Sequence, residues 1–220
     1  MTARMKAAQA GLRRARAWLR NLGPRSVLIV LALLGAISAL AHAPYHVSIA
    51  LAVGLSVLLL ALDDARSKPN PVLAAFFRAW AFGFGHFLAG TFWVANAFLV
   101  SAQDHAWLIW APLSLLPGGL ALFWGAAGMA YTALRPRADA RVLAFAGLFF
   151  TVEALRSHIL SGFPWNLAGH VFEAGGAISQ TASLVGALGL TAVTLYVFSA
   201  PAALLGRGPL LNRAYPAGLS

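Results

Sequence analysis

The sequence predicts an all-α protein, a polytopic membrane helix bundle with about six transmembrane helices. Hydrophobic residues make up 60% of the 220-residue chain, charged residues only 10%, and the mean hydropathy is +0.76. Soluble domains are about 45–50% apolar and about 25% charged. The apolar residues gather in six long runs, and the basic residues lie between these runs. So few charges cannot cover a water-facing surface, which excludes a soluble enzyme, and the absence of cysteine excludes a disulfide-rich secreted domain.

The six apolar runs have lengths near the roughly 20 residues that a helix needs to cross a bilayer. They cover residues 27–43, 47–62, 74–101, 106–134, 142–160 and 184–205. The first two are short and close together, so they predict a thin helical hairpin or a re-entrant pair. The third and fourth exceed one crossing and must tilt, kink or begin in an interfacial helix. We expect Pro112 and Pro117 to break the fourth run.

Basic residues alternate from one loop to the next. Of the 16 Lys and Arg residues, 15 lie in segments 1–25, 63–78, 135–141 and 206–220, and none lies in the intervening loops. Cytoplasmic loops carry such an excess, so we expect six membrane crossings with both ends cytoplasmic. The expected layout is a basic cytoplasmic tail (1–25), a six-span membrane domain (26–206) and a cytoplasmic end (207–220) that marks a truncation point. The net charge of +10 thus reads as an orientation signal, and nucleic acid is not an expected partner.

Glu153 and Arg156 are the charged pair inside the fifth run. They are three residues apart and therefore lie on one helix face, where they can form an ion pair. Charges inside a membrane are candidates for function, because each alone costs about 2.5–3.5 kcal/mol at mid-membrane. The alternative is a structural ion pair, with Arg156 extending its charge to the interface.

The segment after this run, 161–170, predicts an ordered turn. Pro164 fixes its own φ and disfavours helix at Phe163, so the helix should end by about residue 160. Trp165 and its neighbour Asn166 then lie where an aromatic ring suits the headgroup level. An interfacial turn with an aromatic anchor is the simpler interpretation, and a substrate-facing turn is the alternative.

Small residues line the third run. Gly83 and Gly90 are two turns apart, Gly85 belongs to a second small stripe, and small residues allow helices to approach closely in a membrane. His86, Gly90 and Trp93 share one side, and a lone histidine in an apolar helix is more often a packing residue than a ligand. No acidic or cysteine partner stands at ligand spacing from the six histidines, so neither a metal nor another cofactor is expected.

Four motifs in order resemble a known family. Glu153-Ala154-Leu155-Arg156 followed by Ser161-Gly162-Phe163-Pro164-Trp165 resembles the E-x-L-R and T-G-F-P-W signature of bacterial apolipoprotein N-acyltransferases. The other three are the turn 43–45, the glycine- and aromatic-rich stretch 83–93 and the segment 180–186. The resemblance covers about residues 31–205 and implies the N-terminal membrane domain of that family.

The resemblance implies an activity and partners. Family members move an acyl chain from a membrane phospholipid to the N-terminal diacylglyceryl-cysteine of a lipoprotein substrate, through an acyl-thioester on a cysteine. Their Glu, Lys and Cys catalytic set lies on a periplasmic nitrilase-like domain. This chain has no cysteine, so the set is not carried over and the chain alone is expected to be inactive. What carries over is a lipid and peptide entrance shaped by Glu153, Arg156, Phe163, Pro164, Trp165 and Asn166.

Two other functions remain open from the residues. One is a six-helix transporter or channel with Glu153, Arg156 and His86 along its path, and the other is a non-catalytic membrane scaffold. The transporter is disfavoured because the intramembrane polar residues are few and no internal repeat is evident.

The charge alternation generates a topology prediction. Reporter fusions after Arg66 and Arg137 should be active in the cytoplasm, and fusions after Gln103 and Gly175 in the periplasm, because positive loops stay inside. Paired alkaline phosphatase and green fluorescent protein fusions at each site check this. A periplasmic signal after Arg137 would contradict six crossings.

Overall fold

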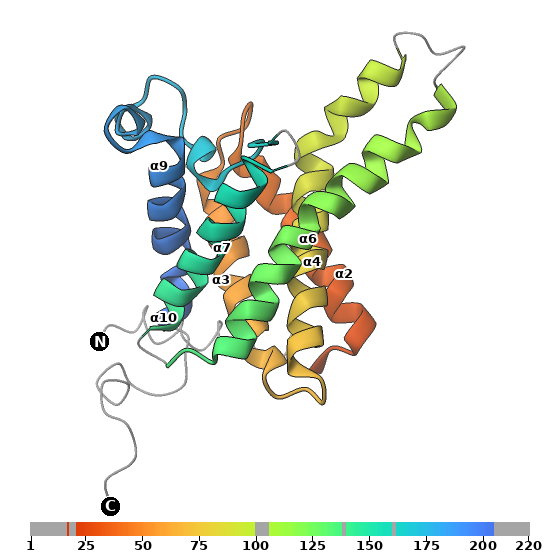
Figure 1. Ribbon diagram of the computed structural model, residues 1–220, viewed down its shortest axis with the longest axis vertical. Helices are drawn as coiled ribbons and strands as arrows, with labels where there is room; N and C mark the ends of the chain where they lie inside the picture. Colours follow the sequence, from red (N-terminus) through yellow and green to blue (C-terminus); the bar gives the residue numbers. More distant parts are fainter. Residues whose placement is uncertain (1–16, 18–20, 100–105, 138–139, 160–161, 205–220) are drawn as a thin grey trace, which may run out of the picture.

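A computed structural model describes residues 17, 21–99, 106–137, 140–159 and 162–204, and these residues form a helix bundle (Figure 1). The longer helices are α2 (Pro24–Ser38), α3 (Ser48–Ala65), α4 (Pro71–Thr91), α6 (Trp110–Leu134), α7 (Arg141–Arg156) and α9 (Ala182–Ser199). Short 3-10 or helical turns extend them at η1 (Ala39–Ala41), η2 (Phe92–Leu99), η3 (Ala106–Leu108), η4 (Ala168–Val171), α8 (Ala177–Gln180) and α10 (Pro201–Leu204). Most of the predicted tail (1–25) and all of the predicted C-terminal end (207–220) lie outside the described residues.

The predicted all-α membrane bundle is confirmed. Five of the described segments are long and apolar enough to cross a membrane: Pro24–Ala41, Ser48–Ala65, Pro71–Leu99, Trp110–Leu134 and Ala182–Ala203. Helix α7, the fifth predicted crossing, has 16 residues and ends at Arg156 instead of near residue 160. It nevertheless lies beside α6 and α9 within the bundle (Figure 1).

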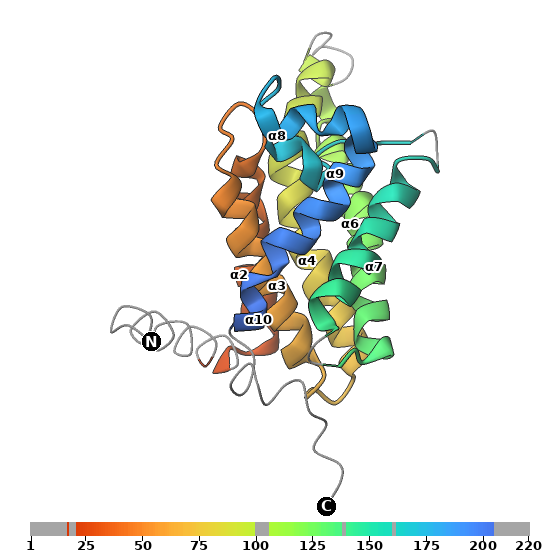
Figure 2. The same cartoon turned by 90° about the vertical axis from the view of Figure 1, so that its left-hand side faces the viewer.

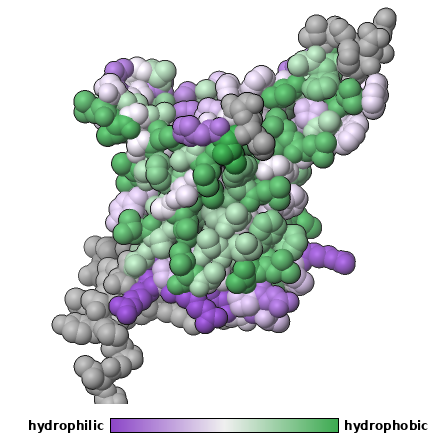
Figure 3. All heavy atoms as spheres, in the orientation of Figure 1, coloured by the Kyte–Doolittle hydropathy of each residue, from purple (hydrophilic) through white to green (hydrophobic). Residues whose placement is uncertain are grey.

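The surface of the bundle suits lipid. Many large apolar side chains are exposed around its middle, among them Ile29 at 62% and Leu143 at 66%. Figure 3 shows this hydrophobic belt, with hydrophilic residues concentrated along the lower rim. A monomeric soluble protein rarely exposes contiguous apolar area on this scale, so the belt indicates the region that acyl chains cover.

Helix α3 forms the centre of the bundle. It packs against α2, α4, α6, α9 and α10, and its leucines at 55, 58, 59 and 62 are fully buried. A helix that is apolar on all sides is expected in such a position. Figure 2 shows α9 crossing the bundle obliquely, with α8 at its upper end and α10 at its lower end.

Glycines set the distance between α2 and α4. A Cβ on Gly85 would overlap the carbonyl oxygen of Ala32, and a Cβ on Gly35 would overlap that of Phe82. Gly83 faces α6 instead, where a Cβ would lie 3.2 Å from the Cβ of Trp124. Helices in a bilayer gain no hydrophobic stabilisation from association, so close van der Waals packing of this kind holds them together instead.

The predicted break in the fourth run is wrong, because α6 is one helix from Trp110 to Leu134. Pro112 lies in the first turn, where a backbone N–H has no partner within the helix. Pro117 removes one internal hydrogen bond, which neighbouring helices allow in membranes. Next to it, Trp80 Nε1 of α4 donates to the carbonyl of Gly118 at 3.1 Å.

A charged cluster ties the helices at one end of the bundle, which we call the basic-loop end because it carries the loops around Lys68 and Arg137. Asp63 of α3 accepts hydrogen bonds from Tyr131 Oη of α6 at 2.8 Å and from Arg141 Nη1 of α7 at 2.7 Å. Arg141 also donates to the carbonyl of Ala202 in α10. One carboxylate thereby joins α3 to α6 and α7, and Arg141 links this cluster to α10.

This cluster predicts that Asp63→Asn is strongly destabilising. The change leaves Arg141, whose side chain is only 9% exposed, without its counter-charge. Removing one partner of a buried pair costs about 3–5 kcal/mol. Thermal unfolding in detergent measures the loss, and Glu173→Gln, the same kind of change at an exposed acid, should leave stability unchanged. Equal effects of the two substitutions would contradict the role of Asp63.

Candidate functional site

Glu153 and Arg156 form a fully buried ion pair at the end of α7 opposite the basic-loop end. Arg156 Nε lies 3.0 Å from Glu153 Oε1, and Nη2 lies 2.6 Å from Oε2. The residues are 1% and 2% exposed, so Arg156 does not extend its charge to the interface. Two parallel charge-assisted bonds of this kind fix orientation as well as charge.

The remaining donors of Arg156 hold the following loop. Nη1 donates to the carbonyl of Phe163 at 2.5 Å and Nη2 to that of Trp165 at 2.8 Å. The backbone N–H of Phe163 returns a bond to the Arg156 carbonyl at 2.9 Å. The exposed Pro164 lies between the two clamped carbonyls. We call this arrangement the Arg156 clamp; it makes the 163–165 turn a fixed part of the bundle.

Aromatic residues of α4 and α6 surround the ion pair. Trp124 Nε1 donates to Glu153 Oε1 at 2.6 Å, and the guanidinium of Arg156 lies 4.9 Å from the ring centre of Phe87. Trp124 also stacks on His86 with ring centres 5.3 Å apart. His86 in turn shares a 2.8 Å hydrogen bond with Ser38. These polar groups are paired with one another, which fits a structural scaffold for the loop better than a transport path.

Asn166 and Trp165 dock onto the end of α4. Asn166 has a φ of 54° and is 7% exposed. Its side-chain amide packs against Gly90, where a Cβ would overlap it, so a larger residue at position 90 would displace Asn166 from this contact. The rings of Trp165 and Trp93 lie 5.1 Å apart. Four predicted residues from two distant segments thus meet at one place.

A cavity of about 500 Å³ opens beside this contact, between the α2–α3 turn, the end of α4 and the clamped loop. Aromatic rings of Tyr45, Trp93 and Trp165 line it, together with the polar side chains of His42 and Asn166. Within the described residues, neither ring nitrogen of His42 nor Nδ2 of Asn166 has a hydrogen-bond partner. Buried polar atoms in proteins are normally paired, so these three atoms, which have almost no exposed area, are unused hydrogen-bonding groups in the wall of the cavity.

His42 is neutral at physiological pH. Burial, with smaller contributions from the nearby His86, His170, Arg156 and His46, lowers its pKa to about 2. A neutral imidazole offers one donor and one acceptor. The cavity therefore presents hydrogen-bonding groups without a net charge of their own.

A second, apolar groove of about 590 Å³ lies on the other side of the clamp, between α6 and the end of α7. Leu116, Leu120 and Phe123 contribute to its walls, and Arg156 and Phe163 close one end. Such a lining suits a hydrocarbon chain. The Arg156 clamp therefore separates an apolar groove from the aromatic cavity.

Two site residues escaped sequence reasoning, His42 and Trp124. In the sequence His42 is one of six histidines without a ligand partner, and within the described residues no group of three His, Cys, Asp or Glu could hold a metal ion. Trp124 lies in a long apolar run where nothing marks which tryptophan faces a charge. The small-residue positions Gly83 and Gly85 pack helices away from the cavity.

The clamp generates a double-mutant prediction. Arg156→Leu alone should destabilise by about 3–5 kcal/mol, because it strands the buried carboxylate of Glu153. Combining it with Glu153→Gln should recover at least about 1 kcal/mol of that loss. Thermal unfolding of the four proteins in detergent measures the coupling, with Arg137→Leu as an exposed control. Strictly additive losses would show that the two residues do not interact.

Comparison with known proteins agrees with the motifs. The family model described as "Apolipoprotein N-acyltransferase N-terminal domain" matches residues 34–200. The apolipoprotein N-acyltransferase of Caulobacter vibrioides is 47% identical over 180 residues, which cover 82% of this chain and 33% of that protein. Those of Rhodopseudomonas palustris and Allorhizobium ampelinum are each 38% identical, covering 87% of this chain and 35% and 37% of their own lengths. The chain spans about a third of the curated relatives it matches, and it belongs to the apolipoprotein N-acyltransferase N-terminal domain family.

Proposed function

We propose that this chain is the membrane part of an enzyme that moves an acyl chain from a phospholipid to the N-terminal diacylglyceryl-cysteine of a lipoprotein. The observation that carries the proposal is the Arg156 clamp, which fixes the signature turn 163–165 between an apolar groove and an aromatic cavity. Family membership supports the reaction class, because the relatives are named for it.

The two cavities divide the recognition of a lipid. The apolar groove accepts an acyl chain, since its walls are leucine and phenylalanine. The aromatic cavity accepts the polar linkage, because His42 and Asn166 line it and a small shift of either side chain turns an unpaired N–H toward an ester carbonyl. Sites of this size, mostly apolar with a few placed polar groups, are typical of small-molecule binding.

The chain supplies the entrance and a second domain supplies the chemistry. Acyl transfer through a covalent intermediate needs an activated nucleophile, and the chain has no cysteine. A periplasmic nitrilase-like domain carrying Glu, Lys and Cys docks over the clamped loop in this proposal. The clamp end of the bundle then faces the periplasm, and the basic-loop end faces the cytoplasm of a bacterial inner membrane.

The first test is the activity of the purified chain. Incubated with phospholipid and a diacylated lipopeptide, it should form no triacylated product detectable by mass spectrometry, because it lacks the thiolate. A chimera that carries this chain in place of the matching third of the Caulobacter vibrioides relative should form the product. Product from the chain alone would contradict the assignment of the chemistry to another domain.

The chimera also tests the entrance. Ala126→Trp should fill the apolar groove and Ala89→Trp the aromatic cavity, and each should lower acyl transfer about 100-fold by misplacing the lipid. Val193→Trp, an exposed position of α9 that lines neither cavity, is the matched control. Equal activity of all three variants at equal expression would contradict the proposed entrance.

A further inference from the structure

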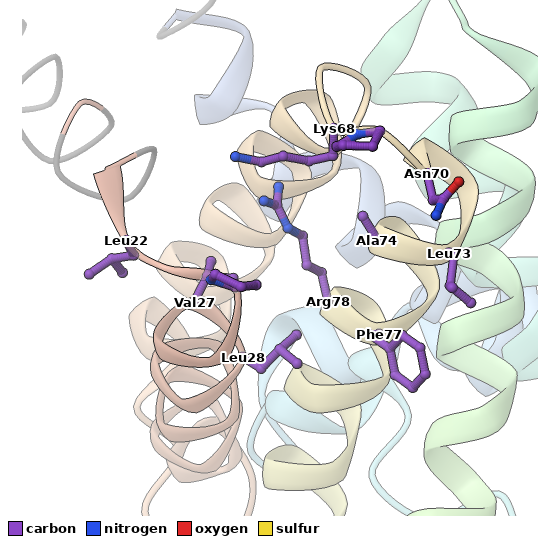
Figure 4. A pocket seen from close by; sticks show the side chains of 11 residues that line it. Leu22, Val27, Leu28, Lys68, Asn70, Leu73, Ala74, Phe77 and Arg78 are labelled. Atoms are coloured by element: carbon purple, nitrogen blue, oxygen red, sulfur yellow. The ribbon is translucent and has the colours of Figure 1, made fainter.

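A separate groove lies at the basic-loop end, far along the bundle from the clamp. It has a volume of about 450 Å³ and runs between the start of α2 and the first turns of α4 (Figure 4). Leu28, Leu73 and Phe77 form its apolar part, and Lys68, Asn70 and Arg78 lie toward the α3–α4 turn. The groove is therefore amphipathic along its length.

The polar part carries an excess of positive charge. Arg78 is 5% exposed, and its Nη1 donates to the carbonyl of Ala61 at 2.5 Å and to Asp64 Oδ2 at 3.2 Å. Lys68 Nζ lies 3.7 Å from the same carboxylate oxygen. Two cations thus converge near one carboxylate among the described side chains, and Figure 4 shows the Arg78 guanidinium directed toward Lys68. A monoanion at this point completes the charge balance.

The apolar part is open to the membrane. Leu73 is 52% and Phe77 44% exposed, on the helix face that joins the hydrophobic belt. A soluble anion would leave these side chains uncovered, whereas an acyl chain would cover them. The guanidinium of Arg78 is suited to a phosphate because its planar fork presents several donors at once.

We propose that this groove binds one anionic glycerophospholipid of the bilayer, with its phosphate at Lys68 and Arg78 and an acyl chain along Leu28 and Phe77. The site is distinct from the entrance at the clamp and does not rest on the proposed acyltransferase function. Its role is to brace α2 against α4 where their first turns diverge around the groove. Juxtamembrane basic residues attract anionic headgroups by about 1 kcal/mol each, which agrees with this assignment.

Lipid binding to the delipidated chain in detergent tests the proposal. Native mass spectrometry should show one saturable site per chain that binds phosphatidylglycerol more tightly than phosphatidylcholine, and thermal unfolding should shift upward with phosphatidylglycerol. Lys68→Gln should weaken binding of phosphatidylglycerol about fivefold. Arg137→Gln, which removes the same charge from an exposed position at the same end, should not. Equal affinity for both lipids, or equal effects of the two variants, would overturn the proposal.

Two further experiments distinguish binding of a lipid from binding of a small anion, and loss of binding from loss of folding. Ala74→Trp fills the apolar part and should abolish the preference for phosphatidylglycerol over phosphatidylcholine, while Val72→Trp, exposed and outside the groove, should not. Glycerol phosphate alone should neither stabilise the chain nor displace the lipid. Stabilisation by glycerol phosphate equal to that by the lipid, or an unchanged lipid preference of a folded Ala74→Trp variant, would overturn the assignment of a lipid.

Discussion

A glutamate and an arginine buried in an apolar bundle must form an ion pair with each other. Their remaining donors and acceptors must find hydrogen-bond partners within the protein, because water does not reach them. The structure meets this requirement by bending the chain back over the end of α7. Arg156 donates two hydrogen bonds to Glu153 and two to loop carbonyls, and Trp124 donates a further hydrogen bond to the Glu153 carboxylate. The position of the 163–165 turn, and through it Trp165 and Asn166, follows from this one ion pair.

The two ends of the bundle use buried charge differently. At the clamp end, Glu153 and Arg156 are close in sequence, and their ion pair fixes the conformation of the 163–165 turn. At the basic-loop end, Asp63 contacts residues of two later helices, and Arg141 extends the cluster to α10, so its consequence is the assembly of helices. Both ends place polar side chains beside a hollow in the surface. These hollows are the aromatic cavity at the clamp end and the groove lined by Lys68 and Arg78 at the basic-loop end.

The helical membrane class, the position of the ion pair and the meeting of small residues between helices could be predicted from sequence. Hydropathy, spacing of three and small side chains each depend on local pattern alone. The carbonyl partners of Arg156 could not, because a loop's path depends on tertiary packing. The expected helix break at Pro117 was wrong, because packing against neighbouring helices allows a proline that would break an isolated helix. Helix α7 ends at Arg156, before the limit of about residue 160 that Pro164 sets, and this arginine turns inward to the loop carbonyls.

The reach of Asp63 has a consequence for biogenesis. Its partner Arg141 lies 78 residues further along the chain, and Tyr131 lies 68. A protein made from its N-terminus inserts α3 before either partner exists. Arg66, one helical turn away at 3.7 Å, is a cation that is already present at that time. We expect Arg66 to neutralise the carboxylate during insertion and to share it with Arg141 once α7 arrives, since all three groups lie together in the folded chain.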